Sequence, residues 1–323
     1  MRNMLIALCF SMFLTAAPAW SGAIPFTAAH GAPTETALHL GWVKFKEVLE
    51  AETNGAIQVD IFPNQQMGGD REYTEAVQLG NLTAGSPSSS PLAGFAREFY
   101  ALDVPFIFTN REDVYAKLDG EAGQLLLDSL EKYNMKGLVY YENGFRNLTA
   151  NKQILSPDDL KGLKLRVMEN RIHLLTWSTL GANPTPLAFG ELFTALQQGT
   201  VDAQENPYEL IYNNKFFEVQ RYLMETFHIY TPYVVFMNLN AYNSFTPAQQ
   251  EAIMKAAVVS RDLQRKLAVE IEAKSKAEIG KVREIVVLTP EQLQVFSSRL
   301  GVVHTEAVKL SGSQAIMDAL LKQ

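Results

Sequence analysis

Two arginines near the ends of predicted strands are the residues whose type and position best suit chemistry. Arg166 lies in the alternating run 163–167 (LKLRV), where the leucines and the valine share one face and Lys164 shares the other with Arg166. A strand with one buried face holds such a guanidinium in place, and its planar fork suits a carboxylate or a phosphate. On spacing alone, an ordinary surface cation is at least as good an interpretation of Arg166.

Arg146 and a polar strand end extend this pattern. Arg146 follows the strand predicted at 136–142 (KGLVYYE), and a second short apolar run, 200–203, leads into the polar sequence 204–206 (QEN). Two strand ends that each present a polar group are able to hold a small anion between them. The serine-rich stretch 82–92 either lines a cleft or forms a flexible loop.

The sequence contains no recognisable catalytic or metal-binding motif. It has no G-x-S-x-G, P-loop or H-E-x-x-H pattern, and its five histidines are scattered along the chain. The neighbouring Asp158 and Asp159 fit the first turn of a helix better than a pair of glycosidase carboxylates. We therefore expect that the protein is not an enzyme and has no metal or cofactor.

Composition and the N-terminal residues indicate an exported globular protein. Arg2, the apolar run 4–14 and the A-x-A pattern at 17–19 form a signal peptide over residues 1–21, cleaved near Ala19–Ser21. The only cysteine, Cys9, lies in this segment, so the mature chain has no thiol, which is typical of a bacterial periplasmic protein. The net charge of −7 and the lack of a basic run argue against nucleic acid as a partner.

The order of predicted elements is that of an α/β protein. A strand at 24–31, a helix at 36–53 and a strand at 56–63 form one strand–helix–strand unit. Later segments are predicted as helices at 73–79, 112–133 and 208–222, a strand within 227–238 and a strand at 285–288. From Thr246 to about Val282 the pattern predicts one helix, longer than the usual 8–20 residues, that braces both lobes of a two-domain protein.

Six motifs are more specific than this general pattern. They are MGGDRE (67–72), GFRNLTA (144–150), LKGLKLRV (160–167), LGANPTPLAF (180–189), LQQGTVDAQENP (196–207) and KFFEVQRYL (215–223). Together they resemble the solute-binding proteins of TRAP transporters, of the DctP type. The resemblance spans almost the whole mature chain and implies a two-lobed periplasmic-binding-protein fold, with mixed sheets flanked by helices.

The resemblance also implies an organisation and a function. Lobe I comprises residues 22–143 plus about 232–271, lobe II comprises residues 144–231 plus about 272–323, and the ligand cleft lies between them. The ligand is an organic acid, either a dicarboxylate or a sugar acid. The protein delivers it in the periplasm to a permease made of a small and a large membrane subunit, and we expect a monomer.

Individual residues match the ligand-binding positions of that family. Arg166 matches the arginine that forms a two-pronged salt bridge with the ligand carboxylate, Arg146 the second, supporting arginine, and Asn206 the asparagine that orients the same carboxylate. Phe189 matches an aromatic wall. His30, Asp70 and Ser88 match first-lobe positions that touch the distal end of the ligand. Glu72, in the MGGDRE motif, is a further candidate for ligand binding.

Some residues depart from the family pattern, and these bear on specificity. An acidic residue is common where Thr83 stands, the sequence 85–87 (GSP) is unusual in what is often a β-branched strand, and Met168 replaces a frequent proline. The sequence leaves open whether four more side chains reach the ligand, namely Arg171, His173, Tyr208 and Glu209.

Two other functions fit an exported α/β protein. One is a ligand sensor that partners a membrane receptor kinase, and the other is a periplasmic enzyme that uses Asp70, Glu72 or His30. No spacing in the sequence supports the enzyme.

Overall fold

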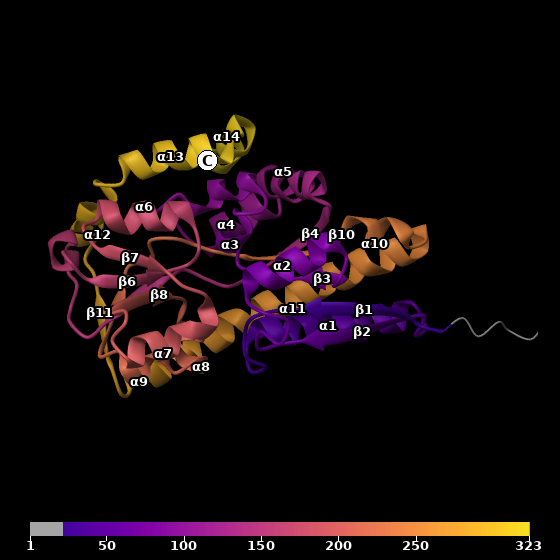
Figure 1. Ribbon diagram of the computed structural model, residues 1–323, viewed down its shortest axis with the longest axis horizontal. Coiled ribbons are helices and arrows are strands. Elements are labelled where there is room, and N and C mark those ends of the chain that lie inside the picture. Colours follow the sequence, from indigo (N-terminus) through magenta and orange to yellow (C-terminus); the bar gives the residue numbers. More distant parts are fainter. Residues whose placement is uncertain (1–21, 323) are drawn as a thin grey trace, which may run out of the picture.

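Two mixed β-sheets, each flanked by helices, form the framework of the protein (Figure 1). The computed structural model describes residues 22–322. The predicted signal peptide and its cleavage near Ala19–Ser21 lie outside the described residues. In this part of the chain no helix has the length and apolar character needed to cross a membrane.

The strands are β1 (Ile24–Ala29), β2 (Ile57–Phe62), β3 (Ala84–Gly85), β4 (Met135–Tyr141), β5 (Asn147–Ala150), β6 (Lys164–Val167), β7 (Asn183–Pro186), β8 (Ala203–Asn206), β9 (Tyr222–Glu225), β10 (Tyr233–Asn238) and β11 (Glu284–Val287). The α-helices are α1 (Ala37–Glu52), α2 (Asp70–Leu79), α3 (Ser89–Leu92), α4 (Arg111–Leu118), α5 (Glu121–Ser129), α6 (Arg171–Thr179), α7 (Leu192–Gln197), α8 (Tyr208–Asn213), α9 (Phe216–Val219), α10 (Leu239–Ser244), α11 (Pro247–Gly280), α12 (Pro290–Ser297), α13 (Gly301–Ser311) and α14 (Gln314–Leu321). Short 3-10 helices are η1 (Arg97–Asp103), η2 (Leu130–Tyr133), η3 (Pro157–Leu160) and η4 (Phe189–Glu191).

The first sheet has the strand order β2-β1-β3-β10-β4, and the second has the order β11-β9-β5-β8-β6-β7. In the first, β1 is parallel to β2 and β3, whereas β10 is antiparallel to β3 and β4. In the second, β5 is antiparallel to β8 and β9, whereas β6 is parallel to β7 and β8. Both sheets are therefore mixed, as predicted.

Two neighbouring segments connect the sheets. The chain leaves β4 for β5 through residues 142–146, and it returns from β9 to β10 through residues 226–232. These segments pair with each other, because the Arg146 N–H donates to the Ile229 carbonyl at 2.9 Å and Phe145 bridges Tyr230. Arg146 therefore lies on a connection between the two sheets.

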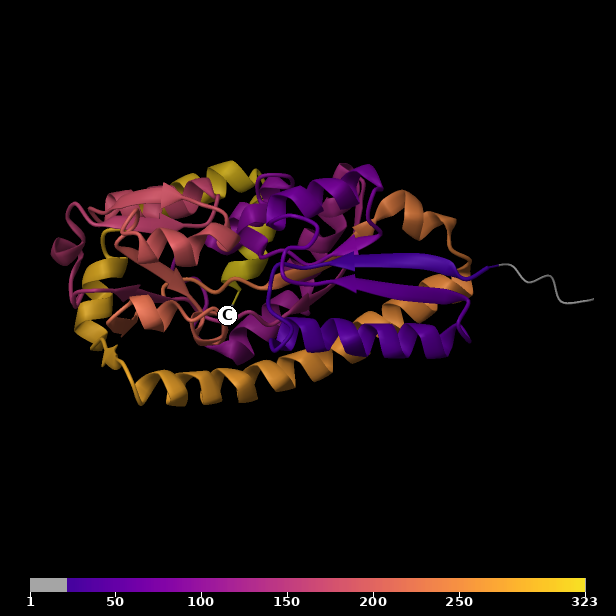
Figure 2. The same ribbon diagram turned by 60° about the horizontal axis from the view of Figure 1, so that its bottom comes forward.

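The long helix predicted from Thr246 is confirmed as α11. Thr246 caps it through a reciprocal pair of hydrogen bonds with Gln249, and the helix runs unbroken to Gly280. Figure 2 shows α11, in orange, running along one side of the molecule past both sheets. It packs on α1 and β4 near one end of its course and on α8 and β11 near the other.

Apolar faces explain where the other helices lie. Leu38, Trp42, Phe45 and Leu49 repeat with helical spacing on α1 and are fully buried against the first sheet and α11. At the chain end, α13 packs on both η1 and α6, and α14 packs on α5. The C-terminal helices therefore contact elements on the sides of both sheets (Figure 1).

Several predicted elements are shorter than expected, because residues with special backbone angles interrupt them. The helix expected at 112–133 is divided into α4, α5 and η2, since Gly120 takes an extended conformation and starts α5. The helix expected at 208–222 becomes α8 and α9, because Lys215 has a φ of 58°. The strand predicted within 227–238 is confirmed as β10, which begins at Tyr233, after Pro232.

Candidate functional site

A cavity lies between the two sheets and encloses about 570 Å³ together with its open mouth. Its lining on the side of the first sheet comprises Gly31, Ala32, Asp70, Ser88, Pro91, Asn143 and Tyr233. The lining on the side of the second sheet comprises Arg146, Arg166, Met168, Glu169, Ala188, Phe189, Asn206 and Leu210.

Strand register explains how residues distant in sequence meet in this wall. Antiparallel pairing of β5 with β8 places Asn147 opposite Asn206, so Arg146 lies beside the end of β8. On the other side of β8, β6 runs parallel to it, with Leu165 level with Ala203. Arg166 therefore lies one strand away from Asn206. Arg146, just before β5, and Arg166, near the end of β6, lie at the same end of the strands of the second sheet.

Arg166 is a buried cation with one side of its guanidinium anchored and another unpaired. The Nε and Nη2 atoms donate to the Leu187 carbonyl at 2.9 and 2.7 Å. The Nη1 atom is buried and has no hydrogen-bond partner among the described residues. Because a buried, unpaired guanidinium nitrogen is costly, this atom is poised to bind an anion in the cavity.

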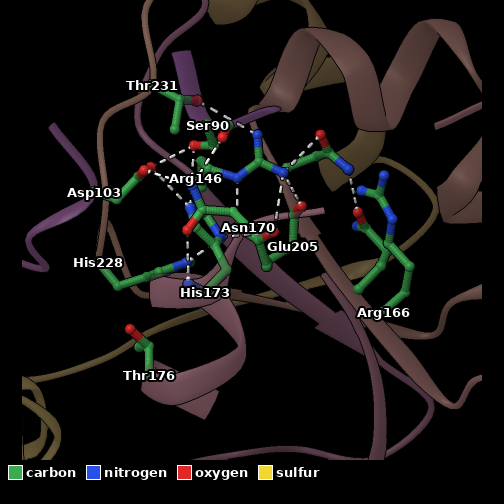
Figure 3. A network of polar contacts seen from close by, with 12 residues as sticks. Ser90, Asp103, Arg146, Arg166, Asn170, His173, Thr176, Glu205, His228 and Thr231 are labelled. Atoms are coloured by element: carbon green, nitrogen blue, oxygen red, sulfur yellow. Dashed lines mark hydrogen bonds and ion pairs between the residues drawn. The ribbon is translucent and has the colours of Figure 1, made fainter. Parts of the chain in front are cut away.

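Arg146 is engaged with the protein itself. Its guanidinium forms a buried ion pair with Glu205, and its Nη2 atom also donates to Asn206 Oδ1 at 3.0 Å. Within residues 22–322 the Nη1 atom has only one hydrogen bond, a long one of 3.4 Å to Thr231 Oγ1. Figure 3 shows Arg146 within this network, with Arg166 to one side of it.

The charges of these groups follow from burial and from their neighbours. Burial, and after it the nearby Arg146, lower the pKa of Arg166 to about 10, so Arg166 stays charged at neutral pH. Burial alone would raise the pKa of Glu205, but the Arg146 guanidinium and a hydrogen bond from His228 hold that pKa far below its usual value. Glu205 thus neutralises Arg146, which allows two arginines to occupy one buried wall.

A second group of buried polar side chains adjoins this pair (Figure 3). Ser90 Oγ donates to Asp103 Oδ1 at 2.5 Å, and Asn170 Nδ2 donates to Asp103 Oδ2 at 2.7 Å. His173 Nε2 lies 3.2 Å from Asp103 Oδ1. Since Ser90 and Asp103 precede β4 whereas Asn170 and His173 follow β6, this cluster joins segments from both sides of the cavity.

Asp70 and Ser88 form the polar part of the opposite wall. Asp70 begins α2, and its two carboxylate oxygens accept the Tyr73 hydroxyl at 2.8 Å and the Ser88 N–H at 3.0 Å. Burial raises the pKa of Asp70 to about 6, so the carboxyl is ionised at neutral pH. The Ser88 Oγ is buried and has no hydrogen-bond partner among the described residues.

Contacts across the mouth join the two walls. The Arg71 Nε lies 3.7 Å from Glu169 Oε1, and both side chains are partly exposed. Phe189 packs against the apolar clusters on both sides and makes an edge contact with Phe216, with ring centroids 5.8 Å apart. Phe189 therefore supplies an aromatic side chain to the lining of the cavity.

A family model described as bacterial extracellular solute-binding protein, family 7 (DctP), matches residues 28–310. This chain belongs to that family. A solute-binding protein of Verminephrobacter eiseniae (strain EF01-2) is 39% identical over 277 residues, which cover 82% of this chain and 82% of that protein.

Two solved structures resemble this DctP-family protein over nearly its whole length. The sugar acid binding protein of Advenella mimigardefordensis, in complex with galactonate, has 31% identity and a TM-score of 0.88, covering 93% of this chain and 97% of that chain. A TRAP periplasmic solute binding protein of Shewanella oneidensis, with bound succinate, has 30% identity and a TM-score of 0.89, covering 93% and 99%. The two relatives have almost equal identity to this chain yet hold different kinds of acid.

The comparisons confirm the predicted family and the two-lobed fold with mixed sheets. The protein is a TRAP transporter solute-binding protein, and its relatives are solute-binding proteins of transporters and not enzymes. The family description also agrees with the predicted export. Among the described residues, no group of His, Cys, Asp and Glu has the arrangement of a metal site.

The cavity wall does not include two of the predicted residues, His30 and Glu72. The His30 ring lies behind the wall, where its Nε2 atom is 3.1 Å from His39 Nδ1, and burial lowers its pKa to about 3. Its neighbours Gly31 and Ala32 line the cavity instead. Glu72 is exposed, because a residue two positions after Asp70 on a helix faces another direction.

The four side chains that the sequence left open do not line the cavity either. Arg171 is exposed, and His173 belongs to the buried cluster around Asp103. Tyr208 donates its hydroxyl to Glu225 at 2.7 Å, and Glu209 accepts the Ala37 N–H at 2.6 Å. Glu209 therefore helps to hold the N-terminal end of α1.

Glu209 allows a test of stability against pH. Burial raises its pKa from 4.5 to about 7 in the folded chain, so its contribution to stability is present below pH 4.5 and lost as the pH rises through 7. Glu209→Gln removes this titration while keeping an acceptor for Ala37. We expect the stability of the variant, relative to the original chain, to rise by roughly 2 kcal/mol between pH 5 and pH 8. Urea unfolding at both pH values measures this, and an unchanged difference would contradict it.

Sequence reasoning missed Glu169, Asn143 and Tyr233, which all line the cavity. Asn143 stands two residues after the end of β4 and three residues before Arg146, so its position close to a strand end was a usable signal. Tyr233 lies inside an apolar run and carries no local sign of its role. It reaches the wall because it is the first residue of β10, where the chain enters the first sheet after leaving β9 in the second.

Proposed function

We propose that this protein binds an organic acid through a carboxylate on Arg166 and delivers it to the small and large membrane subunits of a TRAP permease. The observation that carries this proposal is the buried Arg166 guanidinium, anchored at Leu187 with an unpaired Nη1 atom in the cavity wall. The Nη1 atom and the second N–H of Nη2 offer the parallel pair of donors that suits a carboxylate.

The other wall residues have supporting roles in this proposal. Arg146 contributes its remaining Nη1 donor, and Asn206, held by Arg146 and Gln204, orients the carboxylate. Phe189 packs against the ligand, and Asp70 and Ser88 bind its distal end. One charge-assisted hydrogen bond contributes about 1.5–3 kcal/mol, so two from Arg166 supply a large share of a micromolar affinity near −8 kcal/mol.

Binding closes the cleft because the ligand touches both walls only in the closed state. In this proposal the first sheet belongs to lobe I, residues 22–143 plus about 232–271, and the second sheet belongs to lobe II, residues 144–231 plus about 272–323. The segments at 142–146 and 226–232 and helix α11 connect the lobes. The signal peptide is removed near Ala19–Ser21, and the mature protein works in the periplasm as a monomer.

A thermal-shift screen over organic acids tests the proposal. An acid at 100 times its Kd is expected to stabilise the protein by about 2.7 kcal/mol, whereas the matching neutral lactone or methyl ester is expected to have no effect. Small-angle scattering of the same mixtures is expected to show compaction only with the acid. Stabilisation by the neutral compounds to the same extent would contradict a carboxylate site.

A further inference from the structure

In the cavity wall formed by residues 22–322, one positive charge is free to neutralise a ligand. Among the described lining residues, Arg146 and Arg166 are the cations, and Asp70 and Glu169 are the anions. Glu205 already neutralises Arg146, with which it forms a buried ion pair. Arg166 therefore remains as the single cation without a fully buried acidic partner, and it matches one carboxylate.

The wall opposite Arg166 accepts hydrogen bonds and carries negative charge. Each oxygen of Asp70 accepts one hydrogen bond from the protein, which leaves further lone pairs for ligand donors. The neighbouring residue Ser88 is only 5% exposed, and its buried Oγ atom has no hydrogen-bond partner among the described residues. A carboxylate next to a hydroxyl suits the hydroxyl groups of a ligand.

A second carboxylate is disfavoured at this end for the same reason. Like charges brought together in a partly dehydrated cavity repel each other, and the repulsion serves to reject the wrong ligand. A ligand without hydroxyl groups also leaves Asp70 and Ser88 without the hydrogen bonds they lose from water. Asp70 and Arg166 line the same cavity, so one small molecule in it is able to touch both.

We propose that the ligand is a monocarboxylate that carries several hydroxyl groups, of the aldonate or uronate class, and not a dicarboxylate. Its carboxylate binds Arg166, and its hydroxyl groups donate to Asp70 and bind Ser88 at the opposite wall. This inference rests on the proposed function, in which Arg166 binds a carboxylate, and adds what the rest of the cavity selects.

Calorimetric titration of the mature protein with two groups of acids tests the inference. The first group is galactonate, gluconate, glucuronate and erythronate, and the second is succinate, malate and fumarate. We expect at least one acid of the first group to bind a hundredfold or more tightly than every acid of the second. The inference is overturned if any acid of the second group binds as tightly as the best acid of the first group, or if no acid of the first group binds.

The same titration of Arg166→Ala separates this inference from the proposed function. If Arg166→Ala lowers the affinity for every acid but dicarboxylates bind most tightly to the original chain, the carboxylate site stands and the proposed ligand class is wrong. If Arg166→Ala leaves the affinities unchanged, the proposed function itself is wrong.

Two variants test the opposite wall directly. Asp70→Asn keeps the size and an acceptor oxygen but removes the charge, and we expect the preference for hydroxy acids over dicarboxylates to fall at least tenfold. Ser88→Ala is expected to weaken hydroxy acids several-fold and to leave dicarboxylates unchanged. Glu72→Gln, which removes an exposed charge on the same helix as Asp70, is the matched control and is expected to keep the preference. An unchanged preference in both Asp70→Asn and Ser88→Ala would overturn the inference.

Discussion

Arg166→Ala is expected to lower the affinity for the organic acid by a hundredfold or more. Removing one partner of a buried, hydrogen-bonded ion pair costs about 3–5 kcal/mol, because the other charge is left buried and uncompensated. Here the charge left without its partner is the ligand carboxylate, facing Asp70 and Glu169. Isothermal titration calorimetry with the acid found in the screen measures the loss.

Arg166→Lys distinguishes a two-pronged contact from a simple positive charge. An ammonium group cannot make two parallel hydrogen bonds, and it cannot keep both contacts of Arg166 to the Leu187 carbonyl. We expect Lys to restore little of the affinity. Arg171→Ala removes an exposed cation close by in sequence and is the control, with unchanged affinity. Near-original affinity in Arg166→Lys would contradict the two-pronged contact.

Glu205→Met is expected to destabilise the folded protein by about 3–5 kcal/mol, since it leaves the Arg146 guanidinium buried without its partner. Arg146 is 1% exposed and its remaining neighbours include Arg166, so the variant places two uncompensated cations in one wall. Arg146→Met is expected to cost a similar amount, because it strands the buried Glu205 carboxylate.

The double variant Arg146→Met with Glu205→Met completes the test. It removes both charges, and we expect it to be less destabilised than the sum of the single variants by at least 2 kcal/mol. Urea unfolding of the four proteins gives these values. Glu47→Gln, which breaks the exposed pair with Lys44, is the control and is expected to change stability by less than about 0.5 kcal/mol. Additive effects of the two buried substitutions would contradict the ion pair as a coupled unit.

Much of the fold could be predicted because its signals are local. The alternation in β2, the apolar repeat of α1 and the capped start of α11 depend on residues within one or two turns of each other. The failures are local too: Gly120 and Lys215 interrupt helices that the apolar pattern alone continues. Strand β8 covers Ala203–Asn206 and not the apolar run 200–203. A strand made largely of buried polar side chains has no apolar pattern that would reveal it.

The sequence by itself determined the family, the succession of strands and helices, and the choice of Arg166, Asn206 and Phe189 for the cavity wall. Those inferences rest on residue types and short motifs, which can be recognised in the sequence itself. Only the tertiary structure decided which arginine is free, because the partner of Arg146 lies 59 residues away, on the neighbouring antiparallel strand. It likewise placed His30 behind the wall and brought Asp70 and Arg166 to the same cavity from different sheets. Long-range pairing of buried charges sets these positions, and no local pattern encodes it.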